Sequence, residues 1–136
     1  TLELGIAEES DIPTIVGLAC RKADLLLCPT DNMLASAMDV VASIALHNQK
    51  PLFACHNQAV SQGALAARGV DYKKCGQRAG EIAYTLLSKE TQTAELPIEQ
   101  AETNTVYINQ NTLELLGLGI PETLQSHVIL VNERTT

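Results

Sequence analysis

The chain has 136 residues, the length of one compact domain or of one part of a larger protein. Hydrophobic residues make up 46% and charged residues 18%, a globular composition that excludes disorder as the main state. Nine Lys and Arg against sixteen Asp and Glu give a formal charge of −7, which argues against DNA or RNA as a partner. No apolar run reaches the ~18–20 residues that a membrane span needs.

The pattern of apolar residues predicts strands and helices in alternation. Strands are expected at residues 2–7, 23–28, 51–55, 64–67 and 105–108. Helices are expected after Asp11, over 32–47, from Asp71 to residue 87, over 109–116 and over 122–128. This alternation predicts an α/β fold with a mainly parallel sheet flanked by helices on both faces. The apolar run at 23–28 is typical of a strand buried on both faces, and residues 89–104 read as a polar surface connection.

The sequence contains none of the common catalytic or cofactor motifs. Its four cysteines, Cys20, Cys28, Cys55 and Cys75, form no CxxC pair, so their spacing predicts neither a zinc site nor a thioredoxin-type site. Small buried thiols are the simplest interpretation; a disulfide stays open for an exported protein, and spacing alone cannot pair the cysteines. There is no GxGxxG or GxxxxGK[ST] phosphate loop, no DxD cluster and no HExxH. We therefore expect no catalytic residues, no metal and no cofactor.

Two polar clusters follow two strands of the predicted sheet. Thr30, Asp31 and Asn32 come after the strand at 23–28, and His56 and Asn57 come after the strand at 51–55. Open α/β sheets bind their ligands at the carboxyl ends of the strands. These five residues are therefore the candidate ligand-binding residues.

The first cluster stands at the start of the predicted helix over 32–47. Unpaired N–H groups at a helix start favour a carboxylate, and the Asp31 carboxylate favours an ammonium group. A zwitterion such as an amino acid needs both kinds of partner. The alternative is that Thr30, Asp31 and Asn32 only cap the helix.

The adjacent residues Cys55 and His56 do not form a catalytic pair. Neighbouring side chains on an extended chain point to opposite faces, so the thiol and the imidazole cannot meet. His56 is expected either in the wall of a polar pocket or in a solvated loop.

Three segments, read together, resemble a known family. They are ADLLLCPTDNMLASAMDVVASIALHNQKPLFAC, GALAARGVDYKKCGQRAGEIAYTLL and LPIEQAETNTVYINQNTLELLGLGIPETL. They resemble the C-terminal half of ABC-transporter substrate-binding proteins with the type I periplasmic-binding-protein fold, in the group of tryptophan and tyrosine transporters. The resemblance covers about residues 10–125, and its most specific parts are PTDN at 29–32 together with the segment 63–72.

The resemblance implies a two-lobed clamp that closes on a small solute without catalysis. Such a clamp works with an ABC permease in import, in the periplasm or at the outer face of the cell membrane. Thr30, Asp31 and Asn32 match the family's ligand-facing turn. His56 falls where the family has the Asp of an SD turn, and Cys55 where it has the Ser. One carboxylate is thereby lost, which leaves the identity of the ligand open.

The chain is shorter than a whole clamp, which needs roughly 280–300 residues for two domains. Because it starts at Thr1 without an initiator Met or a signal peptide, we expect a part of a longer protein. Residues 1–62 would be the core of a C-terminal lobe, and residues 63–136 a hinge-side segment that packs partly on the other lobe. The helix over 75–87 would then expose an apolar stripe, so a homodimer is expected. The alternative function is the effector-binding domain of a lactose-repressor-type regulator.

Overall fold

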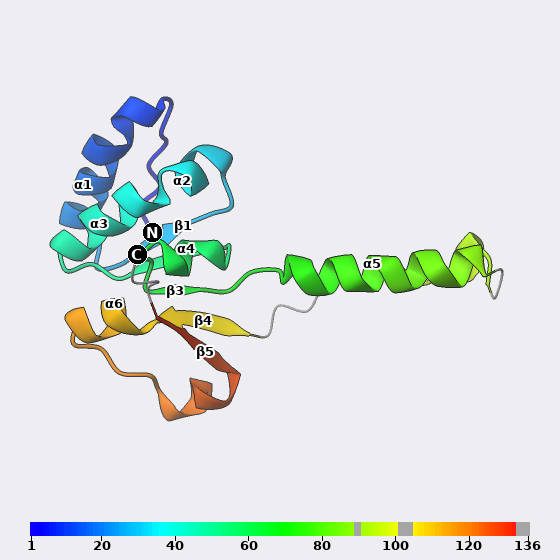
Figure 1. Cartoon of the computed structure of the whole chain (residues 1–136). Helices are drawn as coiled ribbons and strands as arrows, with labels where there is room; N and C mark the ends of the chain where they lie inside the picture. The colour runs from blue at the N-terminus through cyan, green and yellow to red at the C-terminus, as the bar shows by residue number, and fades with distance from the viewer. Residues whose placement is uncertain (89–90, 101–104, 133–136) are drawn as a thin grey trace. The chain divides into compact units, whose positions relative to one another are not determined.

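The computed structural model describes residues 1–88, 91–100 and 105–132 (Figure 1). The chain divides into two compact units, Thr1–Gly69 with Asn104–Thr136 in the first and Val70–Thr103 in the second. All five strands of the described sheet belong to the first unit, which also carries the candidate site.

A five-stranded sheet organises the first unit. Its strands, in their order across the sheet, are β1 (Leu26–Cys28), β2 (Leu52–Ala54), β3 (Ala66–Ala67), β4 (Val106–Asn109) and β5 (Val128–Val131). The pairs β1–β2, β2–β3 and β4–β5 are parallel, whereas β3 and β4 are antiparallel. This confirms the predicted α/β fold with a mainly parallel sheet. The sequence does not predict β5, and the helix predicted over 122–128 is a 3-10 helix, η3 (Glu122–His127), that leads into it.

Two helices build the main core on one face of the sheet. α1 (Ile12–Lys22) follows the short 3-10 helix η1 (Glu9–Asp11), and it packs beside α3 (Met38–His47), as Figure 1 shows. Their apolar sides meet the inward side chains of β1 and β2. The buried residues shared by these four elements are Ile12, Val16, Cys20, Leu26, Cys28, Met38, Val41, Ala42, Ala45, Leu52 and Ala54.

Among the described elements, only the strands β3 and β4 are covered by a helix on the opposite face of the sheet. The strand register aligns one side chain from each strand on this face: Leu27, Phe53, Ala66, Ile108 and Leu130. α6 (Gln110–Leu115) and the turn after it pack over Ala66 and Ile108, so helices do flank both faces. Leu27 is 67% exposed, so the expectation that the strand at 23–28 is buried on both faces is wrong. The reason is that α6 packs over β3 and β4 and not over β1.

The predicted strand at residues 2–7 is also wrong. This segment forms no helix or strand and pairs with no strand among the described residues. A strand needs a hydrogen-bonded neighbour, and β1, the terminal strand of the sheet on this side, pairs only with β2 among the described strands. A groove of about 1090 Å³ lies beside β1, lined by this segment, by α1 and by β1 itself.

The predicted long helix over 32–47 is two helices. α2 (Asn32–Ser36) ends at Ala37, whose φ of −107° and ψ of 20° depart from helical geometry, and α3 then begins. The Ser36 hydroxyl donates to the Asn32 carbonyl oxygen at 2.9 Å. Serine hydroxyls that bond back to the preceding turn bend helices, which is consistent with a break at this position.

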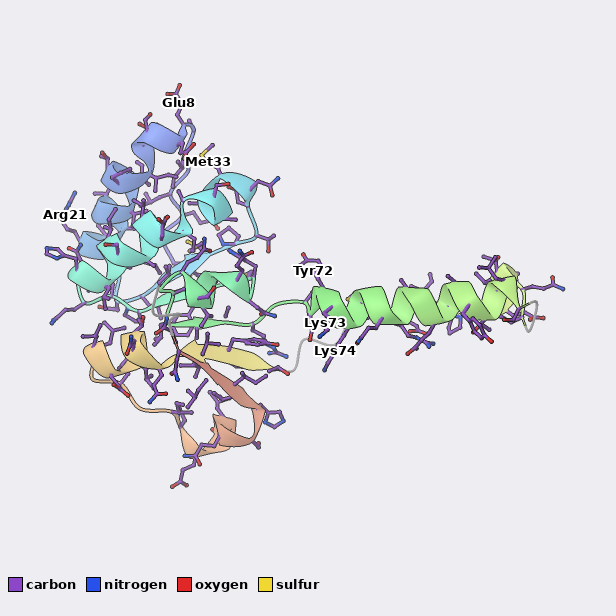
Figure 2. The ribbon with its side chains drawn as sticks, in the orientation of Figure 1. Glu8, Arg21, Met33, Tyr72, Lys73 and Lys74 are labelled. Atoms are coloured by element: carbon purple, nitrogen blue, oxygen red, sulfur yellow. The ribbon has the colours of Figure 1, made fainter. Side chains whose placement is uncertain are left out.

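The second unit consists of α5 (Tyr72–Leu87) and the 3-10 helix η2 (Thr93–Glu95). Asp71 caps α5 by accepting from the backbone N–H groups of Lys73 and Lys74 at 3.0 and 3.1 Å. Figure 2 shows the side chains of Tyr72, Lys73 and Lys74 at this end of the helix. Arg78 binds Glu99 through two hydrogen bonds of 2.7 and 2.6 Å, which ties the segment after η2 back to α5.

No residue of α5 is buried in the structure, in line with the exposed apolar stripe that the sequence predicts. Tyr84 and Leu87 are 69% and 83% exposed, and Ile82 and Leu86 are half-buried. Of the predicted polar connection over 89–104, residues 89–90 and 101–104 lie outside the described residues. The helices of the described part are each too short or too polar to cross a membrane.

Candidate functional site

The two polar clusters lie at the same edge of the sheet. β1 and β2 are parallel neighbours, so the turns that follow them leave the sheet side by side. The Cys55 N–H group donates to the Cys28 carbonyl oxygen at 3.2 Å and joins the two strand ends directly. The structure therefore brings the turn of Thr30, Asp31 and Asn32 next to the turn of His56 and Asn57.

Asp31 is the N-cap of α2. Its Oδ1 atom accepts a hydrogen bond of 3.0 Å from the Leu34 N–H group, and its side chain is exposed. Asp31 thus caps this helix. A carboxylate has two oxygens with about four acceptor positions, so capping leaves capacity for an ammonium group.

The helix that Asp31 caps is shorter than the sequence predicts. Thr30 and Asn32 are exposed, and Asn32 begins a helix of five residues rather than one that runs to residue 47. The dipole of a helix is the sum of its aligned peptide units, so a five-residue helix attracts a carboxylate less than the predicted long helix would. The start of α2 is therefore a weaker site for the carboxylate of a zwitterion than the sequence predicts.

The second turn is packed more tightly than the first. His56 and Asn57 are both half-buried, and their carbonyl oxygens accept from Ala59 and Val60 at the start of α4 (Gln58–Ser61). The Nδ1 atom of His56 is buried and has no hydrogen-bond partner among the described residues. His56 thus has one ring nitrogen shielded from water, which a fully solvated loop residue would not have.

The cysteines near the site differ in exposure. Burial, with a smaller contribution from the neighbouring Cys55, raises the pKa of the Cys28 thiol to about 11, so Cys28 is protonated at neutral pH and is a poor nucleophile. Cys55 is exposed, and all four cysteines are free thiols. No group of three or more His, Cys, Asp or Glu side chains in the described part of the chain is arranged to hold a metal ion.

The chain belongs to the ABC transporter substrate binding protein family, whose model matches residues 1–130. A curated relative, the tyrosine-binding protein of Clostridioides difficile (strain R20291), is 34% identical over 117 residues, which are 86% of this chain and 34% of the relative. The chain thus spans about a third of the length of this relative.

Two solved structures extend the comparison. The first is the ligand-free, open structure of a substrate binding protein with adhesive properties from Clostridium difficile. It is 29% identical, with a TM-score of 0.81, and the match covers 98% of this chain and 44% of that one. The second is an ABC domain in complex with L-Trp from Streptococcus pneumonia. It is 26% identical, with a TM-score of 0.74, and the match covers 93% and 43% of the two chains.

Proposed function

We propose that this chain forms the C-terminal lobe of a two-lobed solute-binding protein that holds an amino acid between its lobes. The observation that carries the proposal is the meeting of two polar turns at one edge of the sheet. A backbone hydrogen bond from the Cys55 N–H group to the Cys28 carbonyl oxygen joins the ends of the two strands. Two relatives support the choice of ligand: one is named a tyrosine-binding protein, and one is in complex with L-Trp. Both relatives are more than twice as long as this chain, which agrees with one lobe of two.

In this proposal each candidate residue has a role. Asp31 accepts hydrogen bonds from the ammonium group of the amino acid, while Thr30 and Asn32 border it with exposed polar side chains. His56 and Asn57 form the neighbouring wall. Because His56 stands where the family has an acid, the pocket carries one negative charge fewer. We therefore expect a different side-chain preference from that of the tryptophan and tyrosine binders.

The site performs no catalysis in this proposal. The Cys28 thiol is held protonated, and the ligand is released unchanged. The partners are a small amino-acid-like molecule and an ABC permease, and the protein works in the periplasm or at the outer face of the cell membrane. Residues 1–62 form the core of the lobe, and residues 63–136 include the segment that meets the other lobe.

Calorimetry on the full-length protein tests the proposal. The panel contains tyrosine, tryptophan, the other amino acids, glucose and adenosine. We expect an amino acid to bind and the sugar and nucleoside not to bind. Binding of glucose or adenosine without binding of any amino acid would show that the ligand class is wrong.

We also propose that the 136-residue chain alone forms a homodimer. The reason is the predicted apolar stripe of α5, in which no residue is buried and Leu87 is 83% exposed. Burial of apolar surface is worth about 25 cal/mol per Å², which favours pairing over exposure. Sedimentation velocity at tens of micromolar measures this directly, and a monomer that binds no apolar dye would contradict it.

A further inference from the structure

Gly69 lies against the turn that follows β2. A Cβ atom added to Gly69 would lie 2.6 Å from the carbonyl oxygen of Cys55, 3.1 Å from the Cα atom of His56 and 3.1 Å from the Oδ1 atom of Asn57. The closest of these atoms belongs to the main chain, so no side-chain rotation can relieve the contact. This turn occupies its place because residue 69 has no side chain.

Backbone hydrogen bonds hold both segments in this arrangement. The N–H group of Cys55 donates to the Cys28 carbonyl oxygen at 3.2 Å, and the N–H group of Arg68 donates to the Ala54 carbonyl oxygen at 3.3 Å. The first bond ties the turn to β1, and the second ties the chain leaving β3 to the end of β2. A side chain at position 69 would therefore force one of these two segments to shift from its place.

We propose that Gly69 is a positioning residue of the ligand site: its missing side chain lets the chain that leaves β3 pass close to β2 and so sets where His56 and Asn57 stand. The buried Nδ1 atom of His56 fits a turn that is tightly packed. The effect on ligand affinity rests on the proposed function, whereas the effect on the turn rests on the contact alone.

The test uses Gly69→Ala in the full-length protein, with Gly5→Ala as the matched control. Gly5 belongs to the same unit, and a Cβ atom added to it meets nothing within 4 Å. We expect Gly69→Ala to shift the backbone amide NMR signals of residues 55–57 and to weaken amino-acid binding at least about tenfold, the scale of one hydrogen bond to a charged group. Gly5→Ala should change neither, and thermal unfolding of both variants separates a displaced turn from a general loss of fold.

Amide signals of residues 55–57 that move no more in Gly69→Ala than in Gly5→Ala would overturn the inference. Signals that move while affinity stays equal to that of Gly5→Ala would overturn its role in binding. If the wild-type protein binds no amino acid, the proposed function fails, and the amide signals alone decide whether Gly69 places the turn. If Gly69→Ala does not fold, a titration of the wild-type protein with its amino acid decides instead. The Gly69 amide signal must then move with those of His56 and Asn57, and an unmoved signal overturns the inference.

Discussion

The side-chain amide of Asn109 donates a hydrogen bond of 2.8 Å to the carbonyl oxygen of Val60, across 49 positions of sequence. Asn109 is fully buried, and its Oδ1 atom accepts from the Thr112 N–H group at 2.9 Å, so one side chain links α4 to the end of β4 and caps α6. Because α4 follows directly from the turn of His56 and Asn57, this amide anchors the helix next to the candidate site.

Asn109→Ala should destabilise the first unit. It leaves the Thr112 N–H group without its partner, which costs about 1–3 kcal/mol, and it removes one of the two hydrogen bonds to the Val60 carbonyl oxygen, which still accepts from the Gly63 N–H group. Urea unfolding followed by circular dichroism measures the change. Asn111 is exposed and lies two residues further along α6, so Asn111→Ala is the control and should stay within about 0.5 kcal/mol of wild type. Equal midpoints for the two variants would contradict the anchoring role.

Asp31→Ala should lower both helix stability and ligand affinity in the full-length protein. Loss of the cap costs about 0.5–2 kcal/mol of stability, and loss of a hydrogen bond to the ammonium group costs about 1.5–3 kcal/mol of affinity. Asp31→Ser separates the two effects, because serine caps the Leu34 N–H group without a charge. Thermal unfolding should recover in Asp31→Ser, while calorimetry should still show weakened binding. Recovery of both stability and affinity in Asp31→Ser would mean that Asp31 only caps the helix.

Cys55 should react with a thiol reagent faster than Cys28 or Cys20. Cys55 is exposed, whereas the other two thiols are 8% and 2% exposed and burial raises the pKa of both. Mass spectrometry of the protein after a short alkylation at neutral pH identifies the labelled position. Labelling of Cys28 or Cys20 before Cys55 would contradict this order of reactivity.

The Glu99 carboxyl group should titrate below its ordinary pKa of 4.5. Hydrogen bonds from Arg78 lower this pKa, so the contact contributes stability above the ordinary value and loses it as the pH falls through the lowered one. Carboxyl carbon NMR signals against pH report the titration. Arg78→Gln should return Glu99 to its ordinary range. Lys73→Gln, which removes a charge from the same helix, should leave it low, and an equal rise in both variants would mean that Arg78 has no specific effect.

The sequence predicts those parts of the fold in which the spacing of apolar residues matches the side chains that are buried in the structure. The apolar runs ending at Cys28 and at Ala54 are strands because their alternate side chains enter the core of α1 and α3. The same reasoning fails at residues 2–7, where an apolar alternation exists but the segment pairs with no described strand. It fails again at β5, a four-residue apolar run that is a strand because it pairs with β4, a segment far from it in the sequence.

The candidate site, like the fold, can be predicted from the sequence only in part. That both polar turns lie at the carboxyl ends of strands follows from the parallel sheet, which the alternation of strands and helices predicts. That β1 and β2 are neighbours, so that the turns meet, is known only from the structure. The break at Ala37 does not follow, because the apolar stripe runs through it without interruption. The contact of Gly69 with Cys55 does not follow either, since it depends on how closely two separate segments pass in space.

The antiparallel pairing of β3 with β4 has a practical consequence for measuring this protein. The Asn109 N–H group donates to the Leu65 carbonyl oxygen, so α6 starts at the amino end of β3, at the edge of the sheet away from the two polar turns. The turn after α6 begins at Gly117, whose φ of 65° suits glycine, and a Cβ atom on Gly119 would meet nothing within 4 Å. A fluorescent dye or a surface tether fixed at residue 119, shortly after α6, would therefore lie away from the two polar turns, and an immobilised biosensor could be attached there with the candidate site left open.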